Sequence, residues 1–130
     1  MITPSDIANI LYRDCQVFGI TVVPDGKKLK GELKSERITI HAKKQQPGTY
    51  WKKSFNEVNL CVPDMKDGEA NTIRLEELEH QAQQVFEDVV GQHDDTTYHY
   101  SIESIGTEED TDLKCHYVNV RILFEVLNVK

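Results

Sequence analysis

The segment CHYVNVRILFEVLNVK, residues 115–130, is the longest apolar stretch in this chain of 130 residues. Its side chains alternate with a period of two, so one face of the extended chain is apolar throughout. That face consists of Val118, Val120, Ile122, Phe124 and Val126. A detachable terminal arm does not need such a face, whereas a core strand does. We therefore predict that residues 115–128 form a strand that packs on the helices through this inner face and can meet a neighbouring subunit through its mixed outer face.

Two amphipathic helices are predicted from apolar residues that recur at helical spacing. The first begins at the capping residue Thr3, which is followed by Pro4 at the favoured first helical position, and it ends before Gly19. The second begins near Asn71 or the following residue and extends to Val90. Both helices have one apolar stripe, so each is expected to cover a sheet.

Short apolar runs and period-two patterns predict strands at residues 20–23, 37–42, 54–62 and 96–105, before the closing strand. Loops are predicted at residues 27–36, 65–71 and 91–95, in the hairpin 43–53 around Pro47-Gly48, and in the acidic turn 106–112. The order α-β-β-α-β-β predicts an α+β fold in a single domain of residues 1–130. We expect a two-layer sandwich, in which a mainly antiparallel sheet of about four or five strands has two helices on one face.

The net charge of −7 is distributed unevenly along the chain. Residues 27–53 contain nine Lys or Arg and two Glu, whereas residues 54–113 contain sixteen Asp or Glu and two Lys or Arg. Such blocks can steer association and decide which surfaces meet, or they can be ordinary solvated surface. They predict an interaction surface that comprises the basic residues and aromatics Lys43, Lys44, Tyr50, Trp51, Lys52 and Lys53 and the acidic residues Glu108, Glu109 and Asp110.

The basic hairpin, residues 43–53, has two interpretations. Its lysines, with Tyr50 and Trp51, could bind single-stranded nucleic acid, because aromatic rings stack on bases. The same residues suit a protein contact, because Tyr and Trp are frequent anchors of protein interfaces. The acidic remainder of the chain would repel a phosphate backbone, which disfavours direct nucleic-acid binding.

The segment HDDTTYHY, residues 93–100, contains potential metal ligands. They are His93, Asp94, Asp95 and His99, and His116 follows in the closing strand. Metal ligands must converge on one point, whereas the first three lie in a predicted loop and His99 lies in a strand whose residues point alternately to opposite faces. We therefore expect no metal and no other cofactor.

The cysteines are predicted to be packing residues rather than nucleophiles. Cys15 falls on the apolar stripe of the first helix, Cys61 lies within a strand, and no CxxC spacing occurs. The odd number of cysteines suits a reducing cytoplasm. Because the sequence also contains no glycine-rich phosphate loop, GxSxG or HExxH pattern, we predict no enzymatic activity. The apolar runs are too short to predict a membrane span.

Three stretches carry a resemblance to a known family. They are SDIANILYRDC (5–15), VNLCVPD (58–64) with the following RLEELEHQAQQVFEDV (74–89), and DLKCHYVNVRILFEVLN (112–128). In order and patterning, these stretches resemble the phage tail-completion and tail-terminator proteins, which are small α+β proteins of the neck that cap the tail tube and join it to the head.

The resemblance implies a non-enzymatic assembly factor that works as a ring with other tail or neck proteins. It would be found in the cytoplasm of a bacterial host and then in the virion. A ring needs unlike surfaces that meet head to tail, and the two charge blocks could supply them. The alternative is a small nucleic-acid-binding or protein-interaction module that uses the hairpin 43–53, and the second alternative is a metal-dependent enzyme.

Overall fold

The computed structural model describes residues 1–24, 27–46, 48 and 50–127. Asp25, Gly26, Pro47, Thr49 and residues 128–130 lie outside the described residues, so the turn predicted at Pro47 and the last residue of the closing strand are not tested. The elements follow one another as α1 (Pro4–Asp14), the short 3-10 helix η1 (Cys15–Phe18), β1 (Val22–Val23), β2 (Arg37–His41), β3 (Trp51–Pro63), α2 (Thr72–Phe86), β4 (Val89–His93), β5 (Thr96–Asp110) and β6 (Cys115–Leu127).

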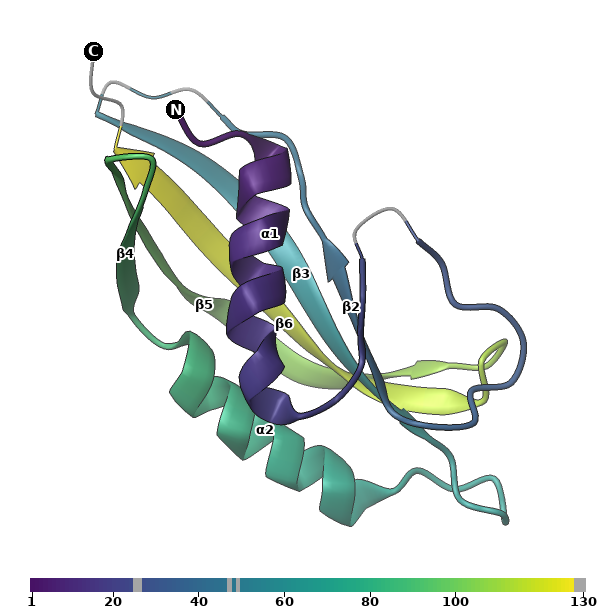
Figure 1. Cartoon of the computed structure of the whole chain (residues 1–130). Coiled ribbons are helices and arrows are strands. Elements are labelled where there is room, and N and C mark those ends of the chain that lie inside the picture. Colours follow the sequence, from purple (N-terminus) through teal and green to yellow (C-terminus); the bar gives the residue numbers. More distant parts are fainter. Residues whose placement is uncertain (25–26, 47, 49, 128–130) are drawn as a thin grey trace.

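The sheet has six strands in the order β1-β2-β3-β6-β5-β4. The short pair β1–β2 is parallel and the other pairs are antiparallel. Figure 1 shows that the long strands curl around α1, which crosses the concave side of the sheet, while α2 runs along its lower border. The predicted sandwich with a sheet of four or five strands is therefore wrong, because the fold is 44% strand and 24% helix and its sheet is a curled half-barrel of six strands.

The curl has a local cause in β5. The register between β5 and β6 shifts between Ile102 and Ser104, which marks a β-bulge. A bulge bends its strand and increases the local twist. The strands β3 and β5, of 13 and 15 residues, also accumulate more twist than the shorter strands predicted at residues 54–62 and 96–105.

The second helix is shorter than predicted, and a strand takes the place of its last turn. The helix α2 ends at Phe86, and Val89–His93 form β4, which pairs with β5. The helical path ends at Glu87, whose backbone is extended with φ −78° and ψ 119°, and Asp88 follows with a φ of 53°. Gly91 is required in β4, because a Cβ there would collide with the hydroxyl group of Tyr98. The predicted loop 91–95 is therefore wrong, and the turn between the strands contains only Asp94 and Asp95.

Two further loop boundaries are corrected by strand pairing. Residues 106–110 do not form an acidic turn but continue β5, and they pair with Cys115–Asn119 of β6. The strand β3 begins at Trp51, so Trp51–Lys53 belong to the sheet rather than to the hairpin loop. In both places β6 supplies a long partner. Its pairing overrides the weak strand preference of the acidic residues 106–110, and it extends β3 to Trp51, a residue type that strands favour.

The predicted inner face of the closing strand is confirmed. Its five members, Val118, Val120, Ile122, Phe124 and Val126, are at most 3% exposed. They share one core with the apolar side chains of both helices, Ile7, Ile10, Leu11, Leu75, Leu78, Ala82 and Phe86. Phe124 stacks on the rings of Tyr98 and Tyr100, with centroid distances of 5.2 and 5.5 Å.

Polar contacts fix α1 to β5. The capping box at Thr3 and Asp6 defines the start of the helix, and the backbone hydrogen bond from Thr3 lowers the pKa of the Asp6 carboxyl group. The Tyr100 hydroxyl donates to the Asp14 carboxylate at 2.7 Å, and burial raises the pKa of Tyr100, so the phenol remains a donor.

Within the part of the chain that the structure describes, neither helix is long and apolar enough to cross a membrane.

Replacing Phe124 by Ala should destabilise the fold by about 3–5 kcal/mol, because the substitution leaves a cavity among stacked rings. Leu123→Ala is the matched control, since Leu123 lies on the outer face of the same strand and is only half-buried. The control substitution should lower the free energy of unfolding clearly less than Phe124→Ala does. Chemical denaturation monitored by circular dichroism measures both values, and equal costs would contradict the inner-face assignment.

Deleting residues 116–130 should abolish the cooperative thermal transition, because the truncation removes the strand that joins β3 to β5. A truncated chain that still melts cooperatively would show that this strand is a dispensable arm. Differential scanning calorimetry distinguishes the two outcomes.

Candidate interaction surface

The predicted basic and acidic residues lie at different ends of the long strands. Trp51 pairs with Leu127 at one end of β6, whereas Glu108 pairs with Tyr117 near the other end. The two β6 partners are ten positions apart, which corresponds to about 33 Å of strand. The structure therefore does not bring the two predicted groups together within one molecule.

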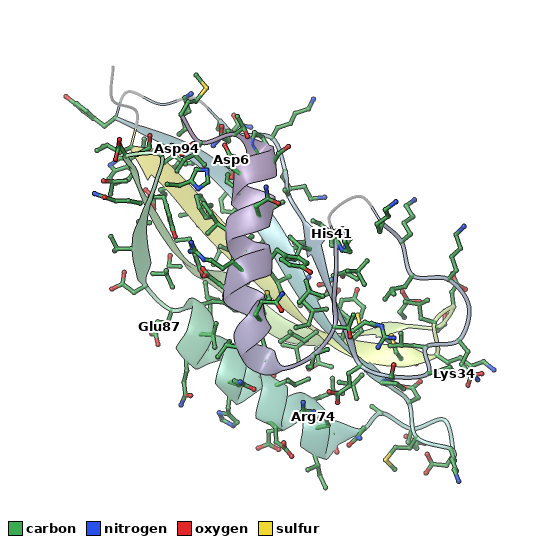
Figure 2. The ribbon with its side chains drawn as sticks, viewed as in Figure 1. Asp6, Lys34, His41, Arg74, Glu87 and Asp94 are labelled. Atoms are coloured by element: carbon green, nitrogen blue, oxygen red, sulfur yellow. The ribbon has the colours of Figure 1, made fainter. Side chains whose placement is uncertain are left out.

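The charge blocks of the sequence are partly mixed by the fold. The basic loop that follows β1 approaches the β5–β6 turn, where the Leu33 amide donates to the Leu113 carbonyl at 2.8 Å. Lys27 and Lys28 share a hollow with Asp110. Figure 2 shows Lys34 at the end of the molecule opposite Asp94. Only the Lys43–Lys53 part of the basic block lies at the far end from Glu108.

A buried asparagine holds the basic loop against the sheet. Asn56 is fully buried, and its side-chain oxygen accepts a hydrogen bond from the Lys43 amide at 2.8 Å. Its amide nitrogen donates to the Ser54 hydroxyl at 3.0 Å. Gln46 then forms a β-bridge with Lys53. These contacts hold Lys43 and Lys44 beside β3.

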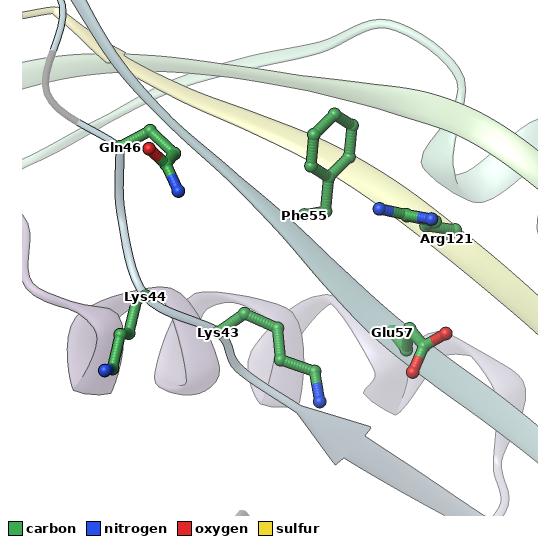
Figure 3. Close-up of a pocket in the computed structure, with 6 residues that line it drawn as sticks. All are labelled: Lys43, Lys44, Gln46, Phe55, Glu57 and Arg121. Atoms are coloured by element: carbon green, nitrogen blue, oxygen red, sulfur yellow. The ribbon is translucent and has the colours of Figure 1, made fainter.

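The loop that contains Lys43, Lys44 and Gln46 lines an open hollow of about 440 Å³ together with the outer face of the sheet. Figure 3 shows its lining residues, Lys43, Lys44, Gln46, Phe55, Glu57 and Arg121. The Arg121 guanidinium lies over the Phe55 ring, 4.5 Å from its centroid. The Phe55 side chain is 38% exposed. The hollow therefore combines cationic groups with an exposed aromatic ring.

Apolar side chains continue from this hollow along the outer face. Phe55 pairs with Leu123, and Trp51 pairs with Leu127 four residues further along each strand. None of the four is fully buried. Since alternate residues of paired strands share a face, these two pairs form one strip, interrupted by Lys53 and its partner Glu125. We call Trp51, Phe55, Leu123 and Leu127, together with the bordering Lys43, Lys44, Lys53 and Arg121, the convex patch.

The sequence identified only part of the convex patch. Lys43, Lys44, Trp51 and Lys53 were predicted, and Tyr50 beside them is 73% exposed. Lys52 pairs with Val126, a residue of the inner face, so Lys52 belongs to the opposite side of the sheet. Arg121 and Leu123 were expected on the outer face of the closing strand, whereas Phe55 was missed. The signal for Phe55 is the alternation of β3, in which the buried Ser54 and Asn56 flank the exposed Phe55.

The histidine and aspartate residues first considered as metal ligands do not converge. His93 lies 3.4 Å from an Asp6 carboxylate oxygen and 3.6 Å from one of Asp94. His99 instead lies 2.7 Å from Asp88 and 3.8 Å from Glu125. Among the described residues, the one group of three ligand-type side chains whose atoms lie within 4.8 Å of one another is Asp64, Glu109 and His116.

All three cysteines are buried, as the packing interpretation predicts. Burial raises the pKa of Cys15 to about 12. A hydrogen bond with Cys115 and burial raise the pKa of Cys61. Because the thiolate is the reactive form, these surroundings disfavour nucleophilic chemistry at Cys15 and Cys61.

No family model, no curated protein and no solved structure matches this chain.

The native protein should resist modification by a thiol reagent such as 5,5′-dithiobis(2-nitrobenzoic acid), and all three cysteines should react after unfolding in guanidinium. The physical reason is that the reagent reaches a buried sulfur only when the fold opens. Absorbance of the released thiolate measures both stages. Rapid release of one equivalent from the folded protein would instead indicate an accessible, reactive cysteine.

Proposed function

We propose that this chain is a non-enzymatic structural assembly protein of a phage tail or neck, of the tail-completion or tail-terminator type, that acts by forming a ring. The observation that carries the proposal is the convex patch at one end of the sheet, with Glu108 and Asp110 near the other end. The resemblance of the sequence to the neck proteins supplies the phage context.

The convex patch has the composition of a protein contact. Trp and Arg are enriched among the residues that dominate interface energetics, and Trp51 and Arg121 both belong to the patch. The aromatic and leucine side chains provide apolar area, while Lys43, Lys44 and Lys53 provide a positive border. Such a border complements carboxylates on a partner and fixes the register of the contact.

A second copy of the chain provides that complement. Glu108 and Glu109 are exposed near the far end of the long strands. A contact between the convex patch of one copy and this acidic end of the next is heterologous, because two different surfaces meet. Repeating a heterologous contact closes a ring when the rotation between copies is a whole fraction of a full turn without a rise along the axis, and the proposal requires such a rotation. The proposed partners are therefore further copies and the adjoining tail or neck proteins.

Charge reversal tests the head-to-tail contact. One variant carries Lys44→Glu with Lys53→Glu, and the other carries Glu108→Lys with Glu109→Lys. Each variant alone should remain monomeric, because both of its contact surfaces then have the same sign. An equimolar mixture should assemble, since the reversed surfaces complement each other between variants. Sedimentation velocity measures the three samples beside the wild type.

The control is Glu76→Lys, on the exposed side of α2, with Glu87→Lys, at the residue that follows the helix. Each of its two substitutions changes the charge as much as those of the test variants, and it should assemble like the wild type. Assembly should weaken with added salt, because the charged border is exposed. Two outcomes would contradict the contact: a wild type that stays monomeric at the highest concentration reached, or reversed variants that assemble alone. Flanking genes for a portal, tail tube or tape-measure protein would support the phage context independently.

A nucleic-acid-binding module is the second candidate, and the hollow beside Phe55 favours it. A base could stack on the exposed ring while Lys43, Lys44 and Arg121 approach the phosphates. Fluorescence anisotropy with labelled oligothymidine tests this function. Salt-sensitive binding that Phe55→Ala weakens at least tenfold would favour the module over the assembly protein.

A further inference from the structure

The inner face of the sheet changes character where β6 begins. His116 lies next to the buried Val118 on this face, nearer the start of the strand. It pairs with Val62 of β3 on one side and with Glu109 of β5 on the other. Asp64 lies two residues beyond Val62, and its backbone amide donates to the Lys114 carbonyl at 3.0 Å. Three chain segments therefore bring one imidazole and two carboxylates to the same end of the sheet.

The two ring nitrogens of His116 have different surroundings. Nδ1 lies 2.7 Å from Oδ1 of Asp64, a short hydrogen-bond distance, and the Asp64 side chain is only 13% exposed. Nε2 lies 3.8 Å from Oε2 of Glu109, which is too long for a hydrogen bond. The Asp64 contact therefore holds the proton on Nδ1 and leaves the lone pair of neutral Nε2 directed to the side where Glu109 lies.

This arrangement matches the carboxylate–histidine–metal order of protein metal sites, in which the outer carboxylate orients the imidazole and raises its basicity. A nitrogen ligand at about 2.0–2.1 Å and a carboxylate oxygen at about 2.0–2.2 Å from one zinc ion lie roughly 3.4 Å apart in tetrahedral geometry. His116 Nε2 and Glu109 Oε2 lie 3.8 Å apart, and a small movement of the exposed Glu109 side chain would bring them to the ligand spacing. The observed distance is therefore closer to the spacing of two metal ligands than to the length of a hydrogen bond.

We propose that His116 Nε2 and the Glu109 carboxylate bind a divalent transition metal ion such as zinc, with Asp64 as the positioning residue. The remaining coordination positions are open to water. The adjoining hollow is lined by three carboxylates, Glu32, Asp64 and Glu109, and by two ammonium groups, Lys66 and Lys114. Lys34 pairs with Glu32 at 3.0 Å, so the formal charges around the hollow balance. The attraction for a cation therefore comes from Asp64 and Glu109, the two carboxylates that lie beside His116. This inference does not depend on the proposed function.

The site lies at the rim of the sheet, beyond Val62 and Val118, the last members of the hydrophobic core cluster on this end of the inner face. Folding is therefore independent of the metal, and the chelator-treated protein should melt cooperatively. Zinc should then raise the melting temperature with increasing concentration, because it binds the folded state preferentially.

Isothermal titration of the chelator-treated full chain with zinc tests the site. The wild type should bind one equivalent. His116→Gln and Glu109→Gln should each weaken binding at least tenfold, and Asp64→Asn should weaken it by about 10–100-fold through the loss of orientation. Glu109→Gln keeps the test valid if His116→Gln fails to fold, since the Glu109 side chain is 56% exposed. Melting curves in chelator establish that each variant is folded.

His93→Gln is the matched control, because His93 also lies against two carboxylates, those of Asp6 and Asp94, but at the other end of the sheet. It should bind zinc like the wild type. Cobalt provides an independent readout of the ligands: nitrogen and oxygen ligation gives visible ligand-field bands, whereas a near-ultraviolet thiolate band would place the metal on cysteine. That band, the absence of binding to the wild type, or unchanged binding by His116→Gln and Glu109→Gln would overturn the proposal.

Discussion

The structure depends on the pairing of β6 along both of its edges. Every residue of β6 pairs with β3, and all but the last pair with β5. This double pairing satisfies the backbone groups of a strand whose inner side chains are excluded from water. It also holds together two halves of the chain, since β3 precedes α2 and β5 follows β4. Without β6 the concave surface on which α1 packs would not exist.

The curl of the sheet decides how the rest of the chain is used. A flat sheet of this width would leave the helices side by side on one broad face. The bulge in β5 and the twist of the long strands instead form a trough. In this trough α1 contacts β5 through the hydrogen bond of Asp14 with Tyr100. The outer face is consequently convex, and the side chains that it exposes are available to partners.

The two proposals use different parts of the same strands, except that both include Glu109, which belongs to the proposed acidic contact and to the proposed metal site. The proposed subunit contact uses the outer face near the start of β3, where Phe55 and Leu123 form a cross-strand pair. The proposed metal site uses the inner face at the opposite end, where His116 and Glu109 form another. In both cases the alternation of side chains along paired strands decides which residues meet. Chemistry at either end can therefore change without disturbing the buried central part of the sheet.

Local sequence determined the elements whose signals are strong and short-range. The capping box at Thr3 and Asp6 defines the start of α1, and the unbroken alternation from Val118 to Val126 identifies the inner face of β6. The Lys, Tyr and Trp residues of the basic hairpin likewise indicated a contact region.

Only the tertiary structure decided the remaining features, because they depend on pairing between distant segments. Val89 and Val90 continue the predicted second helix and the next residues were predicted as a loop, yet pairing with β5 makes Val89–His93 a strand. The acidic residues 106–110 have weak strand preference, yet β6 holds them in register. Register also determined that Phe55 meets Leu123 and that Glu109 lies opposite His116. A shift by one residue would place these side chains on the other face, and no local pattern fixes that choice for polar segments.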